Sequence, residues 1–214
     1  MRIVILGPPG SGKGTIAKII EDMYRIPVVT TGDLLRKAVI DGTWIGNRAK
    51  VFMEKGELVP DELVNEIVSQ RLIKPDARDG FILDGFPRSL NQAKALDDIL
   101  HKINKRIDHV IHVDLEDDII VNRLNNRLTC PKCGAIYNLL NKPPKEDNKC
   151  DICGTYLILR EDDRPEVTRN RLRIYREKTQ PLLTWYQEKG RVETIRGDIA
   201  LSKLPIEIKK LLEK

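Results

Sequence analysis

The stretch GPPGSGKGT at residues 7–15 decides the fold of this chain. It follows the apolar run IVIL at 3–6 and precedes a segment of helical character at 16–20. A strand, a glycine-rich turn and a helix in that order predict a phosphate-binding loop, because glycines let backbone N–H groups converge on one anion. The dipole of the following helix and the ammonium group of Lys13 would add to this attraction.

One position departs from the usual form of such a loop. A serine or threonine commonly follows the lysine, whereas here Gly14 follows it and the hydroxyl comes at Thr15. A glycine-rich turn before a helix can also serve simple packing. The complete GxxxxGK spacing after an apolar run favours the phosphate site.

The composition is that of a globular protein. The chain has 214 residues, of which 41% are hydrophobic and 32% are charged, enough for one sizeable core with small lobes. No stretch approaches the roughly 20 apolar residues of a membrane span, and no signal peptide is recognisable. We therefore expect no membrane partner and a cytoplasmic location. The net charge of +5 permits nucleic-acid binding but equally suits a cleft for polyphosphates.

Strands and helices are expected to alternate along the chain. Short apolar runs predict strands at 3–6, 27–29, 81–84, 109–115 and 192–195. Helical patterns follow at 30–39, 49–55, 62–73, 89–100, 117–127, 165–188 with a kink near Pro181, and 204–212. This alternation predicts a parallel sheet covered by helices on both faces.

All four cysteines fall in two C-x2-C pairs, at Cys130, Cys133, Cys150 and Cys153. The spacing C-x2-C-x16-C-x2-C is typical of a zinc ribbon, in which two tight turns present four thiolates to Zn²⁺. Four thiolates complete the coordination shell, so the zinc would be structural. Two disulfides are the alternative, and the lack of a secretory signal disfavours them.

Basic residues gather around the cysteine-containing segment, with 12 of the 37 lysines and arginines between Arg123 and Arg176. Exposed helix faces, or neutralisation of Arg160 and Arg164 by the acidic pair at 162–163, would also explain this charge. The three histidines form no ligand pattern, and no Ser-His-Asp or Cys-His arrangement is present. The lack of such catalytic arrangements fits phosphoryl transfer, which requires positioning and charge neutralisation more than covalent catalysis.

Six motifs together resemble the adenylate kinase family in its long bacterial form, which has a zinc-binding lid. LDGFPR, within the fourth motif below, is highly specific to nucleoside monophosphate kinases. The motifs are GPPGSGKGT at 7–15, TGDLLR at 31–36, GELVPDELV at 56–64, FILDGFPRSLNQA at 81–93, the four cysteines, and REDDRPEVTRNRL at 160–172. The resemblance covers nearly the whole chain.

The resemblance implies an α/β fold of the P-loop nucleoside monophosphate kinase type. A five-stranded parallel sheet flanked by helices would form a core domain of residues 1–29, 60–126 and 164–214. An AMP-binding lobe at 30–59 and a zinc-binding lid at 127–163 would close over the substrates. The chain would be a monomer.

The resemblance also implies the residues of the site. The catalytic cations would be Lys13, Arg36, Arg88, Arg123, Arg160 and Arg171. ATP would contact Gly10, Ser11, Gly12, Lys13, Gly14, Thr15, Arg123, Arg127, Ile136, Tyr137 and Ile199. AMP would contact Thr31, Arg36, Met53, Glu57, Leu58, Val59, Gly85, Phe86, Pro87, Arg88, Gln92, Arg160 and Arg171. Asp33 and Asp84 would hold Mg²⁺ through water.

The implied activity is reversible, Mg²⁺-dependent phosphoryl transfer, ATP + AMP = 2 ADP, without a nucleic-acid partner. A kinase for UMP or CMP, or one with GTP as donor, would share the phosphate machinery, and only base-facing residues such as Thr31 and Gln92 favour adenine. A nucleic-acid-binding ATPase with a zinc ribbon is the alternative from another class. It would require aromatic residues on a basic face, whereas aromatic residues make up only 5% of the chain.

Overall fold

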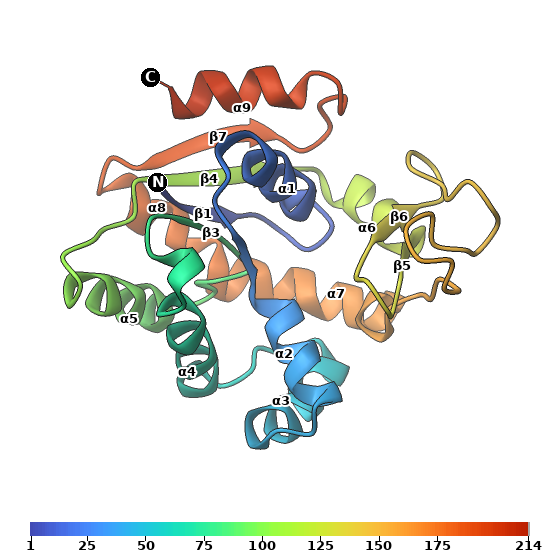
Figure 1. Ribbon diagram of the computed structural model, residues 1–214, viewed down its shortest axis with the longest axis horizontal. Helices are drawn as coiled ribbons and strands as arrows, with labels where there is room; N and C mark the ends of the chain where they lie inside the picture. The colour runs from blue at the N-terminus through green and yellow to red at the C-terminus, as the bar shows by residue number, and fades with distance from the viewer. Residues whose placement is uncertain (214) are drawn as a thin grey trace.

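The computed structural model describes residues 1–213 and places a parallel sheet between two layers of helices (Figure 1). Five strands are hydrogen-bonded in the order β2-β3-β1-β4-β7, and every neighbouring pair is parallel. Their bounds are β1 Arg2–Leu6, β2 Val28–Thr30, β3 Phe81–Asp84, β4 His109–Asp114 and β7 Val192–Arg196. The predicted five-stranded parallel sheet is confirmed.

Helices connect the strands of the sheet, and a last helix follows β7. They are α1 Lys13–Tyr24, α2 Thr31–Ile40, α3 Trp44–Lys55, α4 Asp61–Leu72, α5 Leu90–His101, α6 Asp117–Asn125, α7 Pro165–Ile174, α8 Pro181–Gln187 and α9 Leu204–Leu212. Short 3₁₀ turns lie at η1 Pro75–Ala77 and η2 Glu161–Asp163. Within residues 1–213, no helix combines the length and apolar character needed to cross a membrane.

The core has two halves, one on each face of the sheet. Successive residues of a strand point to opposite faces, so Ile3 and Ile5 pack beneath α1 and α9, whereas Val4 and Leu6 pack against the layer of α4, α5 and α8. Each of these side chains is at most 2% exposed, and each contributes about 1.5–3 kcal/mol to stability. Because the strands are parallel, their carboxyl ends meet at one edge, where ligands bind in such sheets.

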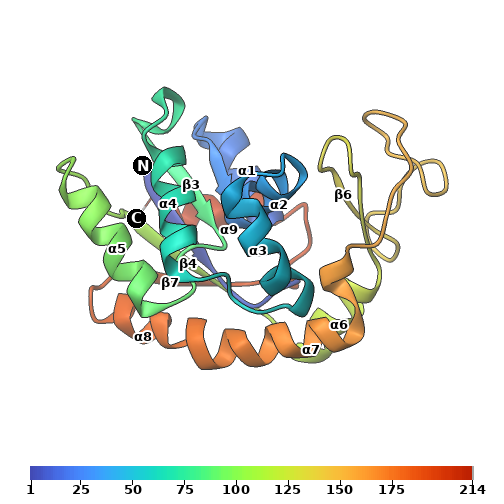
Figure 2. The ribbon, with the colours of Figure 1, turned by 90° about the horizontal axis from the view of Figure 1, so that it is seen from below.

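Two smaller lobes extend from this core. The first consists of α2 and α3, between β2 and α4 (Figure 1). The second, named the lid below, contains the four cysteines and lies between α6 and α7, and Figure 2 shows it beyond the end of the long α8–α7 run. Its antiparallel hairpin, β5 Arg127–Thr129 and β6 Ile136–Asn138, covers a small separate cluster of buried side chains.

The helix predicted at 49–55 begins five residues earlier, at Trp44. The hydroxyl of Thr43 accepts a hydrogen bond from the N–H of Gly46 at 3.1 Å, so Thr43 is the N-cap. Gly46 lies inside the helix because the backbone of α2 passes so close that a Cβ would fall 2.0 Å from the carbonyl oxygen of Ala38. Close packing of two helices, rather than a turn, explains this glycine.

Two other helix boundaries differ from the prediction. The helix predicted at 117–127 ends at Asn125, and Arg127 begins strand β5. The predicted helix at 165–188 is divided by a π-helical turn, η3 Tyr175–Thr179, before α8 starts at Pro181. Proline has no N–H to continue the α-helical ladder, and the N–H of Gln180 bonds to the carbonyl of Tyr175 at 2.8 Å.

Candidate active site

The predicted phosphate-binding loop connects the end of β1 to the start of α1. Gly10 and Gly12 have φ angles of +79° and +103°, which a side chain would oppose, so glycine at these positions lets the loop curl. Lys13 is the first residue of α1. The free N–H groups at the start of this helix make the loop attractive to an anion.

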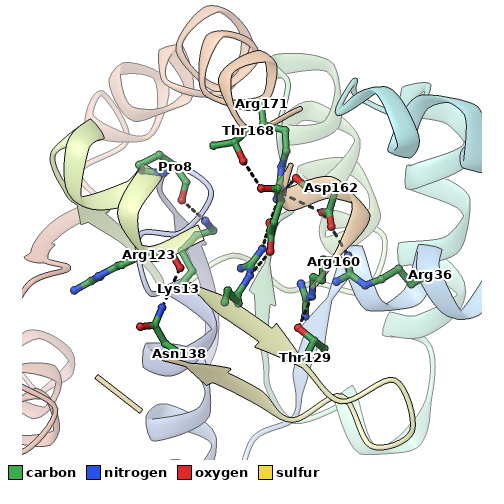
Figure 3. A network of polar contacts seen from close by, with 12 residues as sticks. Pro8, Lys13, Arg36, Arg123, Thr129, Asn138, Arg160, Asp162, Thr168 and Arg171 are labelled. Atoms are coloured by element: carbon green, nitrogen blue, oxygen red, sulfur yellow. Dashed lines mark hydrogen bonds and ion pairs between the residues drawn. The ribbon is translucent and has the colours of Figure 1, made fainter. Parts of the chain in front are cut away.

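The side chain of Lys13 folds back over the loop. Its Nζ donates to the carbonyl oxygens of Pro8 at 2.7 Å and Gly7 at 2.9 Å, and Figure 3 shows the contact with Pro8. Burial lowers the pKa of Lys13 from 10.5 to about 8, although the carboxylate of Asp84 acts in the opposite direction. The ammonium group still carries its positive charge at pH 7, and nearby acidic groups neutralise that charge only in part. Such a group favours the binding of a phosphate.

Two carboxylates lie at the same edge of the sheet. Asp84 is the last residue of β3 and only 8% exposed, whereas Asp33 lies in the first turn of α2, directly after the neighbouring strand β2. Burial raises the pKa of Asp84, and the positive charge of Lys13 opposes that shift. Carboxylates and water molecules are the ligands that Mg²⁺ prefers, so these two residues suit a hydrated Mg²⁺ ion.

Five arginines from different parts of the chain gather around η2, and Figure 3 labels Arg36, Arg160 and Arg171 among them. Burial together with the charge of Arg171 lowers the pKa of Arg88 to about 10, and burial together with Arg127 does the same for Arg160. Guanidinium groups that repel one another in a buried setting favour the binding of an anion. The five are Arg36 of α2, Arg88 after β3, Arg127 of β5, Arg160 before η2, and Arg171 of α7.

Asp163 neutralises part of this charge. Its side chain has no exposed surface and accepts bonds from Arg127 Nε at 2.7 Å, Arg127 Nη2 at 2.5 Å and Arg171 Nη1 at 3.1 Å. Asp162 pairs with Arg171 at 3.1 Å and lies 3.9 Å from Arg36. Burial alone would raise the pKa of Asp162, but the guanidinium groups of Arg171 and Arg36 hold it below its usual value.

One interpretation of the sequence was that the acidic pair at 162–163 neutralises Arg160 and Arg164. The carboxylates of this pair instead form their closest ion pairs with Arg127 and Arg171. Arg160 donates from Nε to the hydroxyl of Thr129 at 2.9 Å, and Arg164 forms an exposed ion pair with Glu161. The remaining donors of Arg160 are available to a ligand.

Arg123 lies apart from this cluster, on the other side of the phosphate-binding loop (Figure 3). Its Nη1 donates to the carbonyl oxygens of Gly197 at 2.9 Å and Ser11 at 3.4 Å. It thus connects α6 to the loop and to the turn that carries the predicted ATP contact Ile199. Asn138 of β6, which the sequence analysis missed, donates to the carbonyl of Arg123 at 2.9 Å and holds the lid against α6.

A small cavity of about 70 Å³ is lined by residues of both predicted nucleotide subsites. Its lining includes Lys13 and Gly7 of the loop, Leu58 behind α3, Arg88, and Arg171 of α7. Binding sites for ligands of nucleotide size have volumes of several hundred Å³. We therefore expect the lobes to move apart before substrates enter.

Six of the predicted AMP contacts, Thr31, Arg36, Met53 and residues 57–59, lie along the first lobe. Thr31 is 3% exposed, and its Oγ1 has no hydrogen-bond partner within the described chain. Met53 is partly buried in α3, and Gly56, with φ +67°, ends that helix and leads into segment 57–59. Asn170 of α7, which the sequence analysis did not single out, donates to the carbonyl of Lys55 at 2.8 Å and holds this helix end.

Two predicted contact residues have their rings in hydrophobic cores. Phe86 is fully buried in the main core. Tyr137 is 4% exposed in the lid, where its hydroxyl accepts a bond from the N–H of Asp151 at 2.8 Å and lies 3.5 Å from Cys150 Sγ. The neighbouring Ile136 is 42% exposed. Of these three side chains, that of Ile136 has the most surface open to a nucleotide.

The four cysteines converge in the lid on two turns of the same form. Cys130 N–H bonds to Ala135 O, and Gly134 N–H bonds back to Cys130 O, at 2.9 and 3.0 Å. Twenty residues later, Cys150 and Thr155 repeat the first bond at 2.9 Å, and Gly154 and Cys150 repeat the second at 2.8 Å. Each turn presents two thiols to the same point.

The geometry of the four sulfur atoms fits a metal ion. All four lie within 4.8 Å of one another, and Sγ–Sγ distances are 3.4 Å for Cys130–Cys153 and 3.5 Å for Cys133–Cys150. Tetrahedral Zn²⁺ with bonds of about 2.3 Å requires sulfur separations of about 3.8 Å. The thiols are free, so the disulfide alternative does not describe this arrangement. The part of the prediction that is confirmed is that the four cysteines come close enough together to bind a metal.

Sequence reasoning also missed Asp61, the first residue of α4. Its carboxylate accepts hydrogen bonds from Ser89 Oγ at 2.8 Å and Gln92 Nε2 at 2.7 Å. In the sequence it is one of two acidic residues in the first turn of a helix, where a favourable interaction with the helix dipole explains it. Its contact with Gln92 depends on the packing of α4 against α5.

Comparisons with known proteins agree with the motifs. The family model described as Adenylate kinase matches residues 5–191. An adenylate kinase of Archaeoglobus fulgidus is 50% identical over 214 residues, which cover all of this chain and 99% of the relative. Adenylate kinases of Thermosipho africanus and Oceanobacillus iheyensis are 44% and 46% identical, with both chains of each pair covered completely.

Proposed function

This chain belongs to the adenylate kinase family, and we propose that it catalyses the reversible transfer of a phosphoryl group from ATP to AMP, with two ADP as products. The observation that carries this proposal is the convergence of Lys13 with arginines of the first lobe, the core and the lid at one edge of the sheet. Each part of the chain thereby contributes a cation to the same small region. Such an arrangement suits two phosphate chains that meet end to end.

The proposed reaction uses these cations for positioning and charge stabilisation. An oxygen of the AMP α-phosphate attacks the γ-phosphorus of ATP in line with the leaving ADP oxygen. Lys13 binds the ATP phosphates, while Arg88 and Arg171 stabilise the charge on the transferring group. Mg²⁺ bound with ATP would neutralise further phosphate charge, and Asp33 and Asp84 are the residues that would hold its water ligands.

The two lobes are proposed to control access to this centre. The AMP-binding lobe comprises residues 30–59, the lid 127–163, and the core the remaining segments 1–29, 60–126 and 164–214. Arg36 of the first lobe lies 3.9 Å from Asp162, near the end of the lid, so closure of both lobes brings their charges to the same place. Closure excludes water, which would otherwise accept the phosphoryl group and hydrolyse ATP.

The bases are proposed to occupy opposite sides of the phosphate chain. The turn held by Arg123, which carries Ile199, would contact the adenine of ATP together with Ile136 of the lid. The adenine of AMP would contact the amide of Gln92 and the buried hydroxyl of Thr31, which has no hydrogen-bond partner among residues 1–213. The chain is proposed to act as a monomer with free nucleotides, without nucleic acid or membrane.

The substrate assignment predicts that AMP is the preferred acceptor. With ATP and Mg²⁺, kcat/KM for AMP should exceed that for UMP or CMP by at least about tenfold, the scale of discrimination that a base pocket provides. The measurement is a coupled assay of ADP formation with each monophosphate in turn, repeated with GTP as donor. Equal or better turnover of UMP would contradict AMP as the preferred substrate, but the protein would still be a nucleoside monophosphate kinase.

We propose that the cysteine cluster holds one structural Zn²⁺ ion. Four thiolates fill a tetrahedral shell and leave no position for a substrate, so the metal would stabilise the lid without taking part in the reaction. The apolar cluster beneath these turns is small, with Tyr137 and Leu157 among its buried members. A lobe of this size usually requires a metal to hold its shape.

Loss of this metal should destabilise the lid and spare part of the activity. Cys150→Ser is expected to release the zinc and lower Tm, because metal-binding free energy in such a site is also folding free energy. Turnover well below Tm should fall only in part, since Lys13 and Arg88 lie outside the lid. Metal analysis of the native protein and of the variant, with Tm and kcat, tests this. A native protein without zinc would refute the site, and complete inactivity of a folded variant would assign the metal a role in catalysis.

A further inference from the structure

Three side chains form a closed hydrogen-bonded group between α4 and α5. Asp61 accepts from Gln92 Nε2 at 2.7 Å and from Ser89 Oγ at 2.8 Å. Ser89 Oγ in turn accepts from the backbone N–H of Gln92 at 3.1 Å and is the N-cap of α5. On its other side, Gln92 Oε1 accepts from the backbone N–H of Arg88 at 2.7 Å. Gln92 is 1% exposed, so these contacts replace water.

These partners determine which end of the Gln92 amide carries oxygen and which carries nitrogen. A carboxylate can only accept hydrogen bonds, and a backbone N–H can only donate them. Rotating the amide by 180° would place Oε1 against the carboxylate of Asp61 and Nε2 against the N–H of Arg88. Both contacts would be repulsive, in a buried setting where unsatisfied polar groups are costly. The amide is therefore held in one orientation from both sides.

The two bonds leave the amide with one N–H and one oxygen lone pair, in a fixed arrangement. Adenine offers a matching edge, because its 6-amino group donates and its N1 accepts. Hypoxanthine, the base of IMP, offers the reverse, with a carbonyl oxygen at position 6 and a hydrogen on N1. A glutamine free to rotate could bind either edge, whereas a glutamine held in one orientation distinguishes them.

We propose that Asp61 is a positioning residue that makes the acceptor site selective for a 6-aminopurine, through the orientation it imposes on Gln92. This inference rests on the proposed function, in which Gln92 contacts the base of AMP. Asp61 itself touches no substrate. It acts by making one orientation of the amide far more stable than the other, and removing it leaves only the Arg88 N–H to oppose rotation.

The test compares AMP with IMP as acceptors for the wild type and for Asp61→Ala. In the wild type, kcat/KM should favour AMP. In Asp61→Ala the ratio of kcat/KM for AMP to that for IMP should fall by at least about tenfold, mainly through a higher KM for AMP. Asp61→Asn, whose carbonyl oxygen can still accept the Gln92 N–H, should retain more of the ratio than Asp61→Ala.

Two control variants separate this role from helix stability. Glu62→Ala removes the other, exposed acidic residue from the first turn of α4, and Ser89→Ala removes the N-cap of α5. Both should lower Tm slightly and leave the AMP to IMP ratio within about twofold of the wild type, because Asp61 still holds Gln92. The inference is overturned if Asp61→Ala keeps the wild-type ratio, or if both controls lower it as strongly. A wild type that prefers UMP or CMP to AMP would instead refute the proposed function.

Discussion

Replacing Lys13 with alanine should lower kcat by about 10²–10³-fold and change Tm by only a few degrees. The ammonium group lies at the mouth of the phosphate-binding loop and would stabilise charge that develops on the phosphoryl group during transfer, an interaction of this typical magnitude. Its hydrogen bonds to the carbonyls of Gly7 and Pro8 contribute little to folding by comparison. Steady-state kinetics with ATP and AMP, together with thermal unfolding, measure both effects.

The matched control lies on the same helix. Lys18→Ala removes an exposed cation of α1 that pairs with Glu21 and Asp22 on the helix surface, and kcat should stay within about twofold of the wild type. The wild type provides a further check, because the pKa of Lys13 is about 8 and kcat/KM should decline as the pH rises through that value. Near-normal turnover of Lys13→Ala would remove this residue from the catalytic group.

The sheet and its phosphate-binding loop could be predicted from the sequence because their signals are local. Apolar runs such as residues 3–6 and 81–83 are buried on both faces of a parallel sheet and show no polar interruption. The glycines of the loop and Lys13 lie within seven consecutive residues, 7–13. The cysteine pairs are equally local, since each turn forms from consecutive residues and only the meeting of the two turns requires the fold.

The partners of the site residues could not be predicted in the same way. Asp163 meets Arg127 across 36 residues and Arg171 across eight, and no pattern in the sequence distinguishes it from Asp162. Asp61 meets Gln92 across 31 residues through the packing of two helices. The start of α3 at Trp44 was not predicted for the same reason. Gly46 lies inside this helix because the backbone of α2 leaves no room for a side chain there, and that contact is not visible in the sequence. Local signals identify candidate residues, but tertiary packing assigns their partners.

Replacing Asp163 with alanine should destabilise the protein by about 3–5 kcal/mol. The carboxylate is fully buried and is bonded to both Arg127 and Arg171, whose side chains are each 16% exposed. Its removal leaves guanidinium charge buried without its counterion, and breaking a buried pair by removing one partner has a cost of this size. For a chain of 214 residues we expect Tm to fall by roughly 10 °C.

A nucleotide should restore part of this loss if the two arginines also bind phosphate. Saturating ADP with Mg²⁺ should then raise Tm of Asp163→Ala more than that of the wild type, because the phosphates neutralise the charge that lost its partner and bind the folded state alone. Glu161→Ala is the control, since it removes the exposed partner of Arg164 from the same turn and should change stability by no more than about 0.5 kcal/mol. Equal Tm shifts with ADP in the variant and the wild type would show that Arg127 and Arg171 serve the fold and do not contact the phosphates. Equal losses of stability in the two variants would contradict the buried ion pair itself.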